Sequence, residues 1–251
     1  MTQLGALETI RAVSPLINDI GGRFMLHPDT LKIGTDAGYP NGYAWYVAGR
    51  GGVLGDVDAD VVISAFAYFN PEVVRKMWNA GNQVESARQS GSRFATSCAA
   101  WGRQRLHDVE GCERFVELAE RLVNSVDVAG LTLFAAWRSE PLPVDAAGRA
   151  YQLLHVMREW RGSVHIVAVL SGGVTPLQAV LAAEDGSAHA KVYGWGDGLS
   201  NATHLRDQMA GIELLTDNMM LRAFETMLNA TERSEFVELV IRFSNALRLV
   251  S

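Results

Sequence analysis

Five ionisable side chains fall within eleven positions of the stretch "LLHVMREWRGSVHI". His155, Arg158 and Glu159 are spaced at i, i+3 and i+4, so they share one face if the stretch is helical, and Arg161 and His165 follow them. Arginine presents a bidentate fork to a carboxylate or phosphate, and histidine titrates near neutral pH. The pattern predicts an anion site in which Arg158 and Arg161 contact the ligand. His155 or His165 would donate a hydrogen bond or, in an enzyme, act as general acid or base.

A plainer interpretation of this cluster stays open. Glu159 would pair with a neighbouring arginine and the remaining side chains would face solvent, as they do on many exposed helices. A metal site on the two histidines is not expected, because ten residues of straight helix separate His155 and His165 by about 15 Å. Cys98 and Cys112 add no metal-ligand spacing, and we expect them to be buried, reduced thiols. We therefore expect no metal and no cofactor.

The surroundings of the cluster repeat earlier in the chain. Arg50 in "YVAGRGG" and Arg161 in "REWRGSV" each precede an apolar segment, which is followed by "FNPEVVRKMWNAG" or "VTPLQAVLAAEDG". In both copies an N-cap residue stands before a proline at the first helical position, and a glycine ends the helix. Two helix-turn-helix units are expected, and a chance likeness of two helical hairpins is the alternative.

Such a repeat would bring Arg50 and Arg161 to comparable places around an approximate twofold axis. We expect one shared pocket, lined on the first half by Tyr46 and Arg50 and on the second by the cluster. Its apolar walls would come from Phe66, Phe69 and Trp160. The alternative is that each arginine-glycine pair ends a helix and bonds its carbonyl groups.

Apolar residues at three- and four-residue spacing predict a mainly helical chain. The expected helices cover residues 5–20, 57–69, 71–80, 83–100, 110–126, 146–161, 164–171, 176–185, 203–229 and 231–249. One short strand is expected in "KVYGW" at 191–195, as part of a β-wing, and "AGLTLFAAW" at 129–137 is ambiguous.

Two stretches break this pattern. Residues 21–45 are expected to be rich in loops, and residues 138–148 to form a linker. The linker divides the chain into an N-terminal half, 1–137, and a C-terminal half, 146–251, with long C-terminal helices.

Composition argues against nucleic acid as a partner. The chain has 251 residues, a formal net charge of −6 and only three lysines. DNA-binding proteins usually show a basic stripe, because neutralised phosphates supply much of the affinity. The expected recognition helix at 176–185 carries no basic residue and offers only Gln178 for base contacts. We expect DNA reading to have been lost.

The N-terminal region does not resemble a signal peptide, since Glu8 interrupts its apolar stretch. No apolar run approaches the roughly 18 residues of a membrane span. We expect a cytoplasmic protein, monomeric or homodimeric, without membrane contact.

Three blocks carry a resemblance: "YVAGRGGVLGDVDADVVISAFAYFNPEVV", "LLHVMREWRGSVHIVAVLSGGVTPLQAVL" and "AGIELLTDNMM". They resemble a family of actinobacterial proteins described as helix-turn-helix or MarR-like, whose SalK-type members lie near genes of specialised metabolism. The matching residues are Tyr46, Arg50, Leu54, Gly55, Phe66, Phe69, Asn70, Pro71, His155, Arg158, Glu159, Arg161, Gly162, His165, Glu213, Thr216 and Asp217. Ser163-Val164 and Trp160 depart from the family pattern. The resemblance therefore does not imply that this chain binds the same ligand as the rest of the family.

The resemblance implies a tandem winged-helix fold, mainly α with minor β wing strands, in which one chain imitates a MarR dimer. With the cluster, it implies a protein of specialised metabolism that binds a small anionic or aromatic metabolite between its halves. Two alternatives stay open. One is a metal-independent enzyme that uses His155 or His165 as acid and base, and the other is a ligand-responsive MarR-like transcription regulator.

Overall fold

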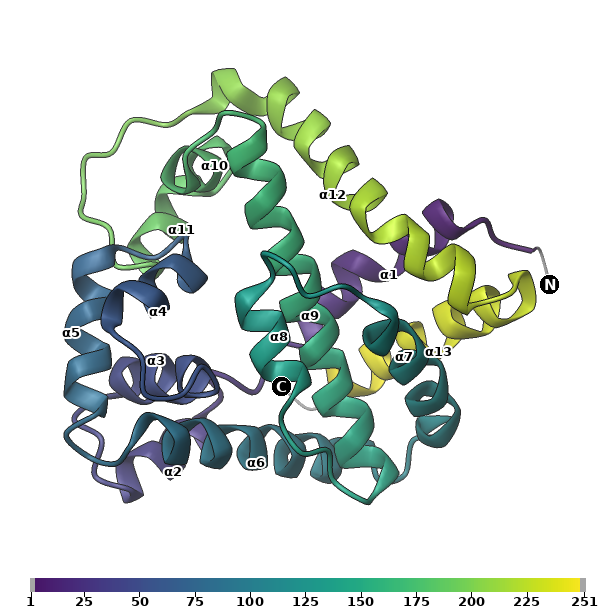
Figure 1. Cartoon of the computed structure of the whole chain (residues 1–251), viewed down its shortest axis with the longest axis horizontal. Helices are drawn as coiled ribbons and strands as arrows, with labels where there is room; N and C mark the ends of the chain where they lie inside the picture. The colour runs from purple at the N-terminus through teal and green to yellow at the C-terminus, as the bar shows by residue number, and fades with distance from the viewer. Residues whose placement is uncertain (1–2, 249–251) are drawn as a thin grey trace.

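The computed structural model describes residues 3–248, and helices follow one another along that range with no strand between them (Figure 1). The prediction of a mainly helical chain is confirmed. The helices are α1 (Ala6–Ile20), α2 (Pro28–Asp36), α3 (Gly42–Gly52), α4 (Ala59–Phe66), α5 (Pro71–Gly81), α6 (Ala87–Leu106), α7 (Cys112–Ser125), α8 (Thr132–Arg138), α9 (Ala146–Ser171), α10 (Pro176–Ala182), α11 (Gly186–Val192), the 3₁₀ turn η1 (Thr203–Leu205), α12 (Arg206–Met227) and α13 (Ala230–Arg248).

Helix α9 runs through the middle of the molecule, and α1, α6, α7, α8 and α12 pack around it (Figure 1). It begins where the Asp145 carboxylate accepts a hydrogen bond from the Gly148 amide at 2.8 Å. Trp137 and Trp160 belong to one large core cluster, which contains residues from before and after the 138–148 segment. The division into two halves stays a prediction.

Helices α3 and α6 approach each other so closely that their backbones touch. A Cβ added at Gly52 would lie 2.2 Å from the Ala87 carbonyl oxygen, and one at Gly91 would lie 2.5 Å from the Gly52 carbonyl carbon. Glycine is costly inside a helix, so the glycines of α3 make its sequence look like a loop. Here that cost is offset by burial, because the whole of α3 after Tyr43 is buried.

Two helix-turn-helix units occur, α4 with α5 and α9 with α10. The N-caps are those the sequence predicts. The Asn70 side chain accepts from the Glu72 amide at 2.9 Å, and the Thr175 hydroxyl accepts from the Gln178 amide at 3.3 Å. The axes of α9 and α10 differ by 101°, within the range of helix-turn-helix pairs.

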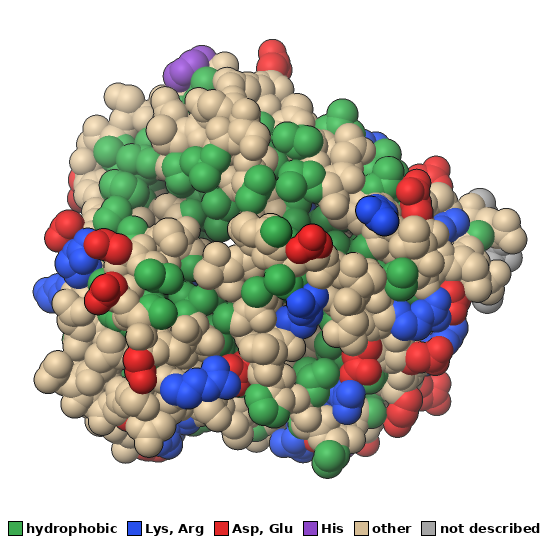
Figure 2. All heavy atoms as spheres, in the orientation of Figure 1, with side chains coloured by type: hydrophobic (Ala, Val, Ile, Leu, Met, Phe, Trp, Pro, Cys, Tyr) green, Lys and Arg blue, Asp and Glu red, His purple; other side chains and the backbone are tan. Residues whose placement is uncertain are grey.

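Figure 2 shows hydrophobic side chains gathered on the part of the surface where Figure 1 places α10 and α11, with few charged groups among them. Among residues 3–248, no single helix is long and apolar enough to span a membrane. The pair α9 and α10 meets the length and composition of a span only when it is taken as one bent unit.

The strand expected at 191–195 is wrong, and within the described range no wing strand is present. Lys191 and Val192 end α11, and the Tyr193 amide continues the helical pattern by donating to the His189 carbonyl at 2.9 Å. Gly194 then reverses the chain at φ +82°, and the Trp195 indole donates to the Tyr68 carbonyl at 2.8 Å. A helix turn and tertiary contacts therefore outweigh the β propensity of this short apolar run.

The loop-rich segment expected at 21–45 instead contains α2 and the start of α3. α2 begins where His27 Nδ1 accepts from the Asp29 amide at 3.2 Å and Pro28 takes the first helical position. The ambiguous stretch 129–137 is helical over α8, and the two helices expected at 146–161 and 164–171 form the single helix α9.

Other helix ends differ from the expected ones by a few residues. The helix expected at 83–100 begins later, at the Ser86 cap, and ends at Leu106. The final residue of the helix expected at 231–249 lies outside the described residues.

Candidate functional site

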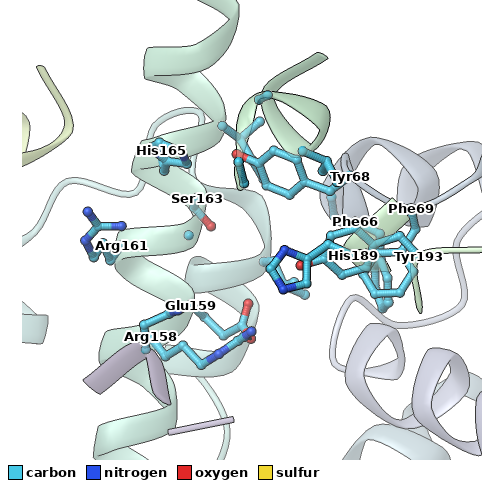
Figure 3. A pocket seen from close by; sticks show the side chains of 18 of the residues that line it. Phe66, Tyr68, Phe69, Arg158, Glu159, Arg161, Ser163, His165, His189 and Tyr193 are labelled. Carbon is cyan, nitrogen blue, oxygen red and sulfur yellow. The ribbon is translucent and has the colours of Figure 1, made fainter. Parts of the chain in front are cut away.

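A cavity of about 530 Å³ lies beside the middle of α9, with α4, α10, α11 and α12 around it. Ligand sites for small molecules span roughly 300–1,000 Å³, so this one has room for a ligand of moderate size. Figure 3 shows α9 on one side of this space and aromatic side chains on the other. The following residues of α9 line the cavity: Arg158, Glu159, Arg161, Gly162, Ser163, His165 and Ile166.

The aromatic wall faces α9 (Figure 3). Its ring centroids are 5.8 Å apart for Tyr46 and Phe66, 5.5 Å for Phe66 and Phe69, and 4.6 Å for Phe69 and Tyr193. The turn between α4 and α5 carries Phe69 into this wall, and Ala67 in that turn has a φ of +40°, which non-glycine residues rarely adopt. Such strained turns cluster at ligand sites, where surrounding packing holds them in place.

A buried ion pair joins α3 to α9 at the base of the cavity. Arg50 Nε and Nη2 donate to the two carboxylate oxygens of Glu159 at 3.0 and 2.8 Å, and Arg158 Nη1 donates to Glu159 Oε1 at 2.9 Å. Arg50 Nη1 also donates to the Tyr46 hydroxyl at 3.0 Å. Burial favours the neutral carboxyl of Glu159, but the charges of Arg50 and Arg158 hold its pKa at about 2. Glu159 is therefore a carboxylate at neutral pH.

Positive charge exceeds negative charge along the cavity. Four arginines and two glutamates line it, an excess of two positive charges before histidine is counted. The Nε atoms of Arg158 and Arg161 are buried and lack hydrogen-bond partners among the described residues. Arg206 is exposed and forms no ion pair with any described side chain, whereas Arg161 Nη2 contacts Glu213 Oε2 at 2.6 Å. The Arg206 guanidinium is therefore available to pair with an anion in the cavity.

His165 is held on α9 by α12. Its Nδ1 lies 2.9 Å from the Thr216 hydroxyl oxygen, and its Nε2 lies 3.6 Å from Glu213 Oε1. Burial is the largest influence on the His165 pKa and lowers it, Arg161 lowers it further, and Glu213 and Asp217 oppose them. The imidazole is therefore neutral at pH 7.

His155 and Trp160 lie outside the cavity. His155 is fully buried, its Nδ1 donates to the Gly21 carbonyl at 2.9 Å, and its ring centroid lies 4.2 Å from that of Trp137. Burial lowers the pKa of His155 to about 4 against the opposing charge of Glu159, so it is an uncharged core side chain at pH 7. Trp160 stacks on Phe224 in the core, with their ring centroids 6.0 Å apart.

The other side chains proposed for the pocket from the sequence all border one cavity. They are Tyr46, Arg50, Phe66, Phe69, Arg158, Glu159, Arg161 and His165. Arg50 does not bond the carbonyl groups at the end of its own helix, because its side chain reaches across to Glu159. Glu159 does pair with Arg158, as in the plainer interpretation, but at 1 % exposure it faces the interior and not solvent.

Sequence reasoning missed several lining residues. Tyr68 and Tyr193 stand in turns, His189 lies in the short helix α11 and Arg206 begins α12, and only the fold brings them to α9. Tyr68 and Glu213 each lie in a block that carries the family resemblance, which is the one signal in the sequence that could have found them. Among residues 3–248, no group of three or more histidine, cysteine, aspartate or glutamate side chains could hold a metal ion.

The sequence matches the helix-turn-helix family over residues 10–203, which covers most of the chain and nearly all of the cavity-lining elements. Comparison with curated proteins and with solved structures gives no match.

Proposed function

We propose that this chain, which belongs to the helix-turn-helix family, binds a small anionic molecule with an aromatic body in the cavity beside α9. The observation that carries the proposal is the arginine excess opposite an aromatic wall, in a protein whose net charge is −6. A ring would pack against Phe66, Phe69 and Tyr193, and a carboxylate would accept hydrogen bonds from arginine. A role as sensor or carrier in specialised metabolism fits such a site.

Arg206 offers a clean test of the anion contact. Because it has no described ion-pair partner, Arg206→Gln removes a charge without leaving another charge unpaired. We expect phenylacetate to bind the variant about fivefold more weakly than the unaltered protein, a change of about 1 kcal/mol for a partly exposed charge. The measurement is isothermal titration calorimetry at low salt.

Two controls belong to this titration. Arg222→Gln removes an exposed arginine from the same helix, sixteen residues farther along and outside the cavity lining, and should bind phenylacetate as the unaltered protein does. The neutral isostere phenylacetamide should bind more weakly than phenylacetate. Equal affinity for both compounds would contradict the anionic part of the proposal.

A ligand-responsive transcription regulator is the second candidate, because helix-turn-helix families include DNA readers. The second recognition helix argues against it. Ala179, Val180, Leu181 and Ala182 of α10 are buried, and the exposed Gln178 is its one side chain suited to base contacts. In an electrophoretic mobility shift assay at low salt, we expect micromolar protein to leave the mobility of the DNA upstream of its own gene unchanged. A salt-sensitive, ligand-dependent shift would favour the regulator.

A further inference from the structure

The cavity contains two proton-handling groups that ligand binding alone does not require. His165 and Tyr68 both line it, their ring centroids are 6.4 Å apart, and Figure 3 shows the Tyr68 hydroxyl directed toward His165. They reach the cavity from different elements, α9 and the turn between α4 and α5.

The hydrogen bonds of His165 fix its tautomer. The Thr216 hydroxyl donates its single proton to the Ile212 carbonyl at 2.8 Å, so its oxygen can only accept from His165. Nδ1 therefore carries the imidazole proton, and Nε2 presents a lone pair. The nearest charged oxygen to Nε2, Glu213 Oε1 at 3.6 Å, is beyond hydrogen-bond distance. Nε2 is a free base at the cavity wall.

Tyr68 is a donor without a partner. Its hydroxyl oxygen is buried and has no hydrogen bond within the described part of the chain. Burial raises the pKa of Tyr68 well above the ordinary value of 10.0, so the hydroxyl keeps its proton at any physiological pH. A buried, unsatisfied hydroxyl is costly, and a ligand oxygen beside it would remove that cost.

We propose that the site catalyses proton transfer at the carbon next to a ketone group, and that its substrates are aromatic α-keto carboxylates. The proposal rests on the binding function above and adds the carbonyl group and the reaction. Arg161, one helical turn before His165, and Arg206 would hold the carboxylate, and the aromatic wall would hold the ring.

The step balances without a co-reactant. His165 Nε2 takes a proton from the carbon beside the ketone, the electron pair of the broken C–H bond forms a carbon–carbon double bond, and the carbonyl π pair moves to oxygen. The Tyr68 hydroxyl donates a hydrogen bond to that developing oxyanion. The imidazolium then returns a proton to the carbon or gives it to the oxygen, which yields the keto or the enol form. A weak base acting together with a tyrosine donor at the oxyanion is a known arrangement for this chemistry, although there a protonated carboxylic acid is a second donor.

The test uses phenylpyruvate in deuterium oxide, with the signal of its methylene protons followed by proton nuclear magnetic resonance. We expect the protein to accelerate their exchange over buffer. Tyr68→Phe and His165→Asn should each slow the catalysed rate by about tenfold or more, the lower end for one general acid–base group. His204→Asn, an exposed histidine outside the cavity lining, should exchange at the unaltered rate.

Two further readouts separate catalysis from structure. Tyr68→Phe should lose more in rate than in affinity for phenylpyruvate, since the hydroxyl bonds the ketone oxygen of the bound substrate and bonds the oxyanion more strongly. Thr216→Val should slow exchange and Thr216→Ser should restore it, because Thr216 positions His165. Circular dichroism of each variant checks the fold.

The outcomes distinguish this proposal from the binding function. Phenylpyruvate that binds without exchanging faster than in buffer would overturn the catalysis and leave the binding function standing. If phenylacetate binds and phenylpyruvate does not, the assignment of aromatic α-keto carboxylates as substrates is overturned, and the binding function stands. Failure of both compounds to bind would overturn both proposals.

Discussion

Replacing Glu159 by glutamine is expected to lower the free energy of unfolding by about 3–5 kcal/mol, the usual cost of removing one partner from a buried ion pair. Glu159 accepts three hydrogen bonds from Arg50 and Arg158, and Arg50 is itself buried. The variant would leave a buried guanidinium without its counter-charge. Urea denaturation, followed by circular dichroism, measures the change.

Glu213→Gln is the matched control, because Glu213 also pairs with an arginine but its side chain is 48 % exposed. Exposed pairs contribute up to about 1 kcal/mol, so this variant should remain close to the unaltered protein. A loss at Glu159 no larger than the loss at Glu213 would contradict the account of the buried pair.

The pKa values of Glu159 and His155 predict how the free energy of unfolding depends on pH. The folded pKa of Glu159 is depressed to about 2 from an ordinary 4.5, so its contribution is complete above pH 4.5 and is lost as pH falls toward 2. The pKa of His155 is lowered from 6.5 to about 4, so the unfolded chain binds this proton first and stability also falls between pH 6.5 and 4. Both groups act in the same direction. Stability that is flat from pH 7 to pH 3 would contradict both assignments.

Gly91→Ala is expected to be nearly as damaging, although it adds a single methyl group. The new Cβ would lie 2.5 Å from the Gly52 carbonyl carbon and 2.5 Å from the Val53 amide nitrogen, so the backbones of α3 and α6 would have to separate. Overpacking typically costs about 1–3 kcal/mol and occasionally more. We expect the upper end, because neither contact is with a flexible side chain. A thermal unfolding curve, monitored by the circular dichroism signal of the helices, gives the change in stability.

Gly211→Ala provides a control of opposite sign. Gly211 lies on the exposed side of α12, and an added Cβ meets no atom within 4 Å. Alanine should stabilise this helix by about 0.5–1 kcal/mol. If Gly91→Ala and Gly211→Ala change the midpoint of thermal unfolding in the same direction and by a similar amount, the close approach of α3 and α6 is not what makes Gly91 necessary.

Local signals in the sequence predicted the parts of the fold that depend on local chemistry. Asn70-Pro71 and Thr175-Pro176 start helices where expected, since a cap and a fixed φ act within a few residues. The strand predicted at 191–195 does not form, because the conformation of this segment depends on Tyr68, which is more than a hundred residues away in the chain. The first turn of α3, residues 42–45, falls in the stretch expected to be rich in loops, and its helical form depends on packing against α2 and α6 that local sequence does not reveal.

The candidate site was predictable to a similar extent. The spacing on α9 placed Arg158, Glu159, Arg161 and His165 together, but it could not tell which histidine faces a cavity. His155 lies on the side of α9 covered by Phe24 and Trp137, whereas His165 lies where α12 and the α4–α5 turn leave space. Helical periodicity specifies the face of a residue, and only the neighbouring elements decide whether that face is filled.

We propose that the cavity beside α9 binds an aromatic carboxylate, and a cavity-filling variant tests this most directly. Ala65 on α4 lines the cavity, so Ala65→Phe would place a ring inside it. We predict that phenylacetate binds the unaltered protein in a one-to-one complex by isothermal titration calorimetry and that Ala65→Phe, with an unchanged circular dichroism spectrum, binds none. Binding that survives in Ala65→Phe would place the ligand elsewhere, and an unaltered protein that binds no aromatic carboxylate would contradict the claim.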